Sequence, residues 1–447
     1  MRLAVNLIAV ACLAACASGK PPADDNAPTL ASLAQREVAV DKARRIESNE
    51  SQAIAAYRKF LDVAPKTATA PGRAEALRRL GDLEMDVADN TSAASANAPE
   101  YKAAVARYQD YLKAYPNDPG NHRVLYQLAR AQEQGGELES ALKTLDQLVA
   151  AYPNTPYREE AQFRRGELLF TLRAYPGAEE AYNAVLAAGA AGSTYQDRAL
   201  YMQGWSRFKQ GRLDEGLRSF FGVLDVKLAG RGDEPLEDLK GLTRGDRELV
   251  EDTLRVMSIS LTQVQGAQAI AAHSTSDTRR AYEHRVYQHL GELYIKQDRV
   301  KDAADAFGLF VQRHPMHAQS PLLQARVIDI YEGGGFNTLA LDAKREYVSR
   351  YGVASEFRKA NPEGWNRAQP LVKTRLAELA RHYHASAQKT KASADYQEAV
   401  RWYRDIITGF PGEPDTAKNH FLLGELLYED ARFAEAAAEY ERVAYAY

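Results

Sequence analysis

The chain has 447 residues, 45% of them hydrophobic, and a formal net charge of −3, because 57 Lys and Arg nearly balance 60 Asp and Glu. A chain with this charge balance lacks the excess of basic residues that is typical of a nucleic-acid-binding protein. No stretch approaches the ~20 apolar residues of a bilayer-spanning helix, which excludes a multi-span membrane protein. The two cysteines, Cys12 and Cys16, lie near the N-terminus. A disulfide framework or a cysteine zinc site in the folded body is therefore excluded.

The first residues have the layout of a secretory signal peptide. A basic residue, Arg2, precedes an apolar run that ends at Leu13, and this run is too short to span a membrane. The following sequence, Leu13-Ala14-Ala15-Cys16, resembles the lipobox of bacterial lipoproteins. The resemblance implies removal of a signal peptide of residues 1–15 and lipidation of Cys16. Ala17 stands where an Asp would resemble an inner-membrane retention signal, so the outer membrane is favoured.

An ordinary signal peptide with an incidental cysteine is the alternative to this lipoprotein interpretation. Residues 16–37 are rich in Ala, Ser, Pro, Asp and Asn. This composition is typical of a flexible tether, which would carry the lipid at Cys16 and hold the folded part away from the membrane.

From about residue 38 onward, apolar residues recur at i, i+3, i+4 and i+7, which predicts an all-α fold of short helices. A small residue recurs at one place of a first helix, at Ala129, Gly166, Gly204, Gly291 and Gly424. The first three are 37 and 38 positions apart. A period of this length indicates an array of helix pairs, with an irregular helical bundle as the alternative.

The register inside each unit is more specific. Counting from the small residue, position +12 is small, +16 is aromatic or large, +19 is apolar, and +24 is proline in several units. Gly291 is followed in this way by Ala303, Phe307, Phe310 and Pro315. Small residues let two helices approach closely, and proline ends the second helix. One pair cannot bury its apolar face alone, so the core requires stacking of units.

This register resembles the tetratricopeptide repeat. The resemblance implies a right-handed superhelix, an α-solenoid, of about eight or nine helix pairs. The sequences Tyr152-Pro153-Asn154, Tyr115-Pro116-Asn117 and His314-Pro315 are similar to unit junctions in two envelope proteins with this repeat. These are the lipoprotein of the β-barrel assembly machinery and the periplasmic coordinator of the Tol–Pal system. Only the repeat type carries over, because this chain is longer and has insertions.

The repeats divide the chain into three parts after the tether. Residues 38–224 form an N-terminal tetratricopeptide array, in which Tyr108 follows Gly81 after about eleven extra residues within 88–99. Residues 225–281 form an irregular insertion with a degenerate repeat and a helix near 246–264. Residues 282–447 form a C-terminal array with a turn at Gly333-Gly334-Gly335. Gly424 predicts a proline at position 448, so we expect this array to be truncated.

Catalytic and metal-binding patterns are weak. His289 and Glu292 lie on one helix face with His284 nearby, but no third ligand presents itself. His382 and His384 are two apart and point to different faces. Without a zinc-protease, phosphate-loop or nucleophile-elbow motif, we expect neither an enzyme nor a metal or other cofactor.

Two tripeptides resemble an integrin ligand. They are Arg231-Gly232-Asp233 and Arg244-Gly245-Asp246, which flank one predicted loop. Such triplets are common in loops rich in glycine and charged residues, so a solvated loop is favoured over adhesion.

Partner binding is expected on the first helices. The family resemblance implies that residues at −3, +1 and +4 from the small position point into a concave groove. These are Tyr126, Arg130 and Glu133, then Phe163, Glu167 and Phe170, then Tyr201, Trp205 and Phe208. Exposed aromatic residues with Arg among them are typical of binding hot spots. The alternative is that several of them form the core between units.

These observations predict a lipid-anchored scaffold on the periplasmic face of the outer membrane. It would bind segments of envelope proteins during envelope assembly or transport, with neither nucleic acid nor a small-molecule substrate expected. The alternative is an N-terminal arm of a larger envelope protein, whose other part carries cell-wall or polysaccharide processing activity.

Overall fold

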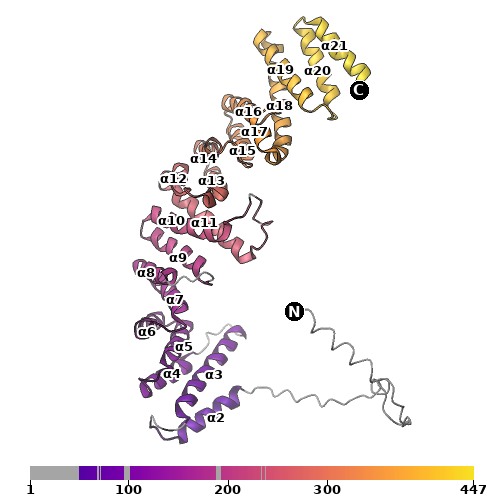
Figure 1. The fold of residues 1–447 in the computed structure, drawn as a ribbon. Helices are drawn as coiled ribbons and strands as arrows, with labels where there is room; N and C mark the ends of the chain where they lie inside the picture. Colours follow the sequence, from indigo (N-terminus) through magenta and orange to yellow (C-terminus); the bar gives the residue numbers. More distant parts are fainter. Residues whose placement is uncertain are drawn as a thin grey trace, which may run out of the picture. The chain divides into compact units, whose positions relative to one another are not determined.

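The computed structural model describes residues 50–447 apart from residues 68, 69, 71, 95–100, 188–192, 233 and 237. The described residues form 20 α-helices and no strand, which confirms the all-α prediction (Figure 1). The predicted signal peptide, Cys16 and the predicted tether lie outside the described residues. The helices are α2 (Glu50–Val63), α3 (Arg73–Ala94), α4 (Lys102–Ala114), α5 (Asn121–Gln134), α6 (Leu138–Ala151), α7 (Arg158–Thr171), α8 (Tyr175–Ala187), α9 (Gln196–Lys209), α10 (Leu213–Leu228), α11 (Arg244–Thr262), α12 (Ala267–His273), α13 (Asp277–Lys296), α14 (Val300–Arg313), α15 (Ser320–Gly333), α16 (Asn337–Tyr351), α17 (Glu356–Ala360), α18 (Pro362–Thr390), α19 (Ser393–Gly409), α20 (Thr416–Glu429) and α21 (Phe433–Ala446).

The chain divides into two units, one that ends at Pro65 and one that begins at Lys66. Helix α2 lies in the first unit. In the second unit, consecutive helices pack as pairs, and each pair packs on the next along the chain (Figure 1). The described residues hold eight such pairs: α3–α4, α5–α6, α7–α8, α9–α10, α13–α14, α15–α16, α18–α19 and α20–α21. This arrangement confirms the predicted array of tetratricopeptide-like helix pairs.

The small residue at the start of the register lies directly against the large residue at +16. A Cβ atom added to Gly166 would lie 2.6 Å from the ring of Tyr182, and one added to Gly204 would lie 2.5 Å from the ring of Phe220. Atoms at these distances overlap, so only glycine allows the ring to reach the first helix. Three further pairs repeat this contact: Gly81 with Tyr108, Gly291 with Phe307, and Gly424 with Tyr440.

Gly81 and Tyr108 are 27 positions apart, and the other four pairs are separated by 16. The eleven extra residues therefore lengthen the connection without changing the packing of the pair. This agrees with the insertion that the sequence predicts within residues 88–99.

Proline marks the end of the second helices. Helices α4, α6, α14 and α19 each end two residues before a proline. The residue between helix and proline has ψ of 58° to 65° in all four cases. Proline disfavours helical geometry in the residue before it, which explains this uniform stop. The four intermediate residues are Tyr115, Tyr152, His314 and Phe410.

In five pairs, the turn between the two helices has a left-handed residue seven positions after the small residue. Gly136 and Gly211 adopt φ of 78° and 75° there, and Gly335 adopts 75° in the triple-glycine turn. Three non-glycine residues occupy the same place in other pairs, Arg173, Asp298 and Ala431, with φ between 56° and 61°. The turn geometry is therefore set by the packing of the pair and persists where the residue disfavours it.

The region 225–281 is part of the same core. Helix α11 begins two residues before the predicted start near 246, and it packs on α10 and α13 in the place of a first helix. The short α12 follows as its partner. One hydrophobic cluster extends without a break from Leu217 through Met257 and Ile270 to Val327.

Across the described ranges, no helix has both the length and the apolar character needed to cross a membrane.

Candidate partner-binding surface

Two of the predicted groove residues lie between repeat units. Tyr126 is 6% exposed and stacks on Tyr157 of the next unit, with ring centroids 4.5 Å apart and planes within 8°. Phe163 is 7% exposed, and its ring centroid lies 5.0 Å from that of Tyr195 in the following unit. In both cases a tyrosine just before the next first helix covers the aromatic at −3. These side chains contribute to stacking of the units and leave little area for a partner.

The charged groove residues form ion pairs and a hydrogen bond between helices. Glu133 pairs with Arg164 of the next unit at 3.0 Å. Arg130 lies 4.0 Å from Asp89 of the preceding unit. Glu167 accepts a hydrogen bond from the hydroxyl of Tyr182. Ion pairs of this kind at partly exposed sites contribute modestly to stability, about 0–1 kcal/mol each, and they fix the register of adjacent units.

Tyr201 and Trp205 remain partly exposed on α9. Their rings meet edge to face at 6.4 Å, and both contact the ring of Phe220. Phe208 contacts Trp205 at 5.3 Å, and the ammonium group of Lys209 lies 5.7 Å from the centre of the Trp205 ring. Burial raises the pKa of Tyr201. The arrangement holds two large aromatic side chains in fixed orientations at the surface, as interface anchors require.

The first helices α7, α9 and α11 enclose a hollow of about 510 Å³. Three predicted groove residues line it, Phe163, Glu167 and Tyr201, together with Met202 and Leu249. Trp205 is not among the lining residues. The hollow therefore connects three successive first helices and combines apolar side chains with polar ones, as ligand-binding surfaces do.

Carboxylates outnumber cations in the lining of this hollow. The described lining residues include five carboxylates and a single guanidinium, that of Arg198, which lies 5.5 Å from the centre of the Phe163 ring. Lys227 stands behind the lining and pairs with both Asp197 and Asp246. The lining carboxylates are Glu167, Asp197, Asp246, Glu248 and Asp252.

The contacts of Lys227 change the pKa of Asp246 and the pKa of Lys227 itself. The hydrogen bond from Lys227, together with those from Thr243, lowers the pKa of Asp246 to about 2. Burial lowers the pKa of Lys227, but its bonds to Asp197 and Asp246 outweigh burial and raise it. The ion pairs therefore hold α9, α10 and α11 together over a wide pH range.

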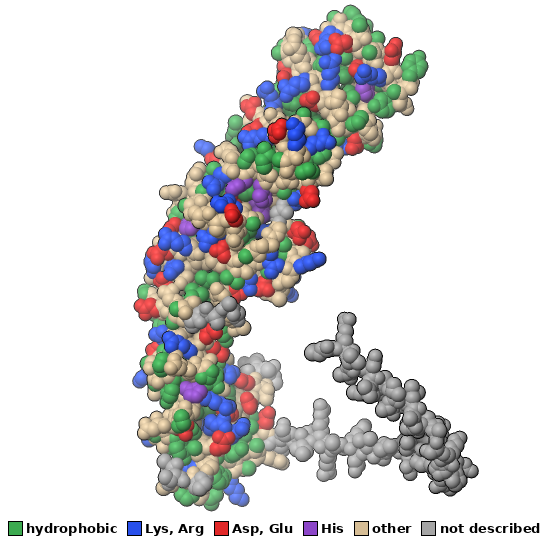
Figure 2. Space-filling view, viewed as in Figure 1, with side chains coloured by type: hydrophobic (Ala, Val, Ile, Leu, Met, Phe, Trp, Pro, Cys, Tyr) green, Lys and Arg blue, Asp and Glu red, His purple; other side chains and the backbone are tan. Residues whose placement is uncertain are grey.

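On the face drawn in Figure 2, Lys and Arg are interspersed with Asp and Glu.

The histidines considered as metal ligands make other contacts. His289 Nε2 lies 3.7 Å from Glu251, and Glu292 pairs with Arg326 at 2.7 Å. The buried ring of His284 packs against Phe310 and His317. His384 contacts the hydroxyl of Tyr403 at 3.1 Å. Within the part of the chain that the structure describes, no group of three or more His, Cys, Asp or Glu residues could hold a metal ion.

The second integrin-like tripeptide has a structural role. Thr243 caps α11 by accepting a hydrogen bond from the backbone N–H of Asp246, and the Asp246 carboxylate accepts one from the Thr243 N–H. This reciprocal capping box satisfies two backbone donors at the helix start. Asp233 of the first tripeptide lies outside the described residues.

Sequence reasoning missed the contribution of α11 to the hollow. Thr243, Glu248 and Asp252 line it, although they belong to the segment predicted as an insertion. The register does not extend through this segment, so counting from a small residue could not find them. The helical periodicity near 246–264 was the one available signal.

Comparison with known proteins agrees with the helix-pair register. Residues 98–162 match the tetratricopeptide repeat family model. This match and the helix-pair array define the class: the chain is a tetratricopeptide repeat protein. No curated protein matches the chain significantly.

Several solved structures are similar to parts of the chain. The crystal structure of MamA is 22% identical, with a TM-score of 0.32, covering 42% of this chain and 93% of that one. A tetratricopeptide repeat protein from Parabacteroides merdae is 14% identical, with a TM-score of 0.30, covering 79% and 98%. The structure of Naa15/Naa10 bound to HypK-THB is 12% identical, with a TM-score of 0.32, covering 88% of this chain and 63% of that one.

Proposed function

We propose that this protein is a lipid-anchored, non-enzymatic scaffold on the periplasmic face of the outer membrane. In this proposal, it binds segments of envelope proteins during envelope assembly or transport. The observation that carries the binding role is the hollow across α7, α9 and α11, whose half-buried apolar lining is Tyr201, Met202 and Leu249. The envelope location is supported by the sequence Leu13-Ala14-Ala15-Cys16 and the signal-peptide layout before it.

The hollow suits an extended segment of a partner protein better than a small molecule. It is bordered by the first helices of three successive units and is open to solvent, whereas small-molecule pockets enclose most of their ligand. A segment lying across these helices would contact Tyr201 and reach the neighbouring Trp205. Large aromatic side chains held in place by packing contribute most of the binding free energy in many interfaces.

Photo-crosslinking in intact cells tests the binding role. A photoreactive amino acid replaces Met202, which lines the hollow, and a matched control replaces the exposed Lys301 on α14. We expect envelope proteins to crosslink at position 202 and not at 301, and the double substitution Tyr201→Ala with Trp205→Ala to abolish these crosslinks. Identical products at both positions, or crosslinks that persist in the double variant, would overturn the assignment. Circular dichroism of the purified variants confirms that the helices are retained.

Fractionation tests the anchor separately. We expect Cys16→Ser to release the mature chain from the membrane fraction, because the acyl chains supply the membrane affinity. Cys12→Ser is the control and leaves the distribution unchanged. A Cys16→Ser variant that stays as membrane-bound as the native chain would contradict the lipoprotein assignment without affecting the binding role.

A further inference from the structure

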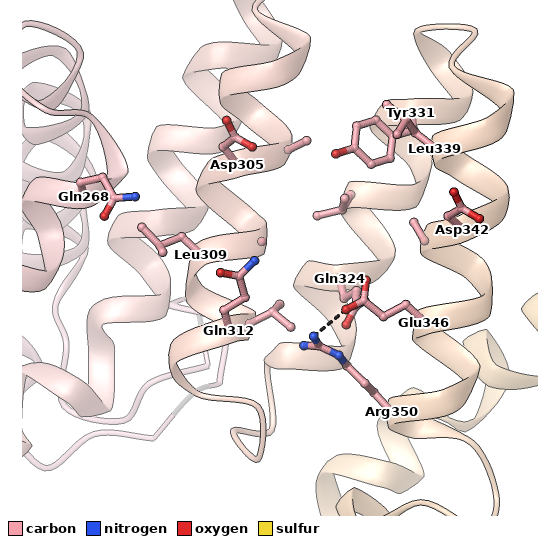
Figure 3. A pocket seen from close by; sticks show the side chains of 15 residues that line it. Gln268, Asp305, Leu309, Gln312, Gln324, Tyr331, Leu339, Asp342, Glu346 and Arg350 are labelled. Carbon is pink, nitrogen blue, oxygen red and sulfur yellow. Dashed lines mark ion pairs between the residues drawn. The ribbon is translucent and has the colours of Figure 1, made fainter.

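A second hollow, of about 530 Å³, lies away from the first-helix surface described above. The second helices α14 and α16 form its sides, and α15 lies between them (Figure 3). Its described lining residues share none with the hollow of α7, α9 and α11. The two surfaces are therefore separate sites on one array.

Acidic side chains predominate among the charged residues that line this second hollow. Three carboxylates line it, those of Asp305, Asp342 and Glu346. Arg350 is the single cation among the described lining residues, and it already pairs with Glu346 at 2.5 Å, as Figure 3 shows. No ion pair within the described part of the chain engages Asp305.

Gln324 adds an acceptor that the protein itself does not satisfy. Its side chain is 5% exposed and lines the hollow from α15, and its Oε1 atom has no hydrogen-bond partner among the described residues. Buried side-chain oxygens are nearly always hydrogen-bonded, because leaving one unpaired is costly. This oxygen is itself buried in the wall of the hollow, where it adds to the negative electrostatic potential.

Apolar side chains complete the lining. Leu309 and Val327 line the hollow, and Leu339 at its edge is 48% exposed. Gly308 on α14 contributes open space, since a Cβ atom there would meet nothing within 4 Å. A partner side chain with an apolar stem and a cationic end matches this combination of surfaces.

We propose that the hollow between α14 and α16 is a second docking site, which binds a protein segment that presents a Lys or Arg side chain beside an aliphatic one. The cationic end lies beside Asp305, and the aliphatic neighbour lies on Leu309, one turn further along the same helix (Figure 3). This inference rests on the proposed scaffold function and gives the scaffold a second partner surface with its own preference.

Selection from a peptide library tests this preference directly. Phage displaying random dodecamer peptides are selected on the full-length mature chain carrying Tyr201→Ala and Trp205→Ala, which removes the aromatic residues of the other surface. We expect enrichment of peptides with Lys or Arg next to Leu, Ile or Val. Failure to enrich any peptide, or enrichment of peptides without a cation, would overturn the proposal.

Substitutions at Gly308 test whether the enriched peptides bind in the hollow between α14 and α16. Gly308→Leu places a large side chain in this space, and we expect it to weaken binding of a synthetic enriched peptide at least tenfold. The matched variant Gly308→Ala leaves most of the space open and keeps binding within about twofold. Equal affinity for the Leu and Ala variants would show that the peptide binds elsewhere and would refute the site.

The charge contribution is tested by Asp305→Asn together with Asp342→Asn. These substitutions keep side-chain size and remove two negative charges, so we expect binding of the cationic peptide to weaken at least fivefold. We also expect the salt dependence of its affinity to become shallower, because screening acts on the charges that are removed. An unchanged affinity and salt dependence would contradict recognition of the cation.

Discussion

Tyr182 donates a hydrogen bond from its hydroxyl to the carboxylate of Glu167, while its ring occupies the place where a Cβ on Gly166 would lie. The acid one position after the small residue thus orients the ring that packs on the small residue. The same relation recurs in the first and last of the eight pairs, at 2.9 and 2.5 Å between the oxygens. These are Tyr108 with Asp82 and Tyr440 with Glu425.

We expect Gly166→Ala to destabilise the protein. The added Cβ would lie 2.6 Å from the Tyr182 ring, and overpacking of this kind costs about 1–3 kcal/mol. Alanine favours a helix over glycine by up to ~1 kcal/mol, which offsets part of that cost. Urea unfolding followed by circular dichroism measures the net loss.

The control for this substitution is Gly308→Ala, where the new methyl group meets nothing within 4 Å. We expect it to raise the unfolding midpoint, because only the helix preference acts there. A second test adds Tyr182→Leu to Gly166→Ala, which reproduces the native combination of Ala129 with Leu145. The double variant should be more stable than Gly166→Ala alone, and an equal stability would contradict the ring clash.

The left-handed position of the turn predicts opposite effects in two units. Gly211→Ala places a Cβ at φ of 75° with open space around it, so backbone strain alone destabilises by about 1 kcal/mol. Arg173→Gly relieves the same strain at φ of 61°. Part of this gain in stability is lost, because glycine has a higher conformational entropy in the unfolded chain. Thermal midpoints of the two variants should move in opposite directions, and a shared direction would refute the turn argument.

Acid should weaken the contact between α10 and α11. The pKa of Asp246 falls from 3.8 to about 2, mainly through the hydrogen bond from Lys227. A lowered folded-state pKa contributes stability that is complete above pH 3.8 and is lost as pH falls through about 2. Because the carboxylate is near solvent, we expect at most about 1 kcal/mol from this source.

Unfolding of the native chain and of Asp246→Asn between pH 5 and pH 2 checks this prediction. The variant should lose less stability than the native chain over this range, since it has no carboxylate to protonate. The Asp277→Asn variant is the control, because Asp277 also lies in a first helical turn and its pair with Arg280 is exposed. Parallel curves for the native chain and Asp246→Asn would contradict the role of the Lys227 bond.

A buried polar contact predicts an effect on stability in α13–α14. The carboxyl group of Glu283 is fully buried and lies against the imidazole of His314, the residue before Pro315. We expect His314→Ala to cost about 1–3 kcal/mol, because it leaves a buried carboxyl group without its polar neighbour. Adding Glu283→Gln should recover part of this loss. If the double variant is no more stable than His314→Ala, the loss comes from packing of the ring on Phe310 instead.

The repeat register was predictable because it depends on local and nearly invariant geometry. A proline two residues after a helix prevents its continuation whatever the rest of the fold does, as at Pro153 and Pro315. A glycine sixteen residues before an aromatic brings the two together across one short turn, as at Gly204 and Phe220. These relations lie within about forty residues, so the sequence alone determines the helix pairs and their order.

Exposure at the partner surface was not predictable in the same way. Tyr126, Phe163 and Tyr201 occupy the same register position, yet the first two are buried and the third is only half-buried. The difference comes from the next unit, which places Tyr157 and Tyr195 over the first two.

The sequence by itself therefore determined an array of tetratricopeptide-like helix pairs. It also determined which positions on the first helices are candidates for partner binding. Only the tertiary structure decided which of those positions remain open, and it brought Asp252 of α11 into the first hollow and Gln324 into the second. The physical reason is that accessibility of a side chain depends on the neighbouring unit. That neighbour is set by packing between pairs, and the register describes only packing within them.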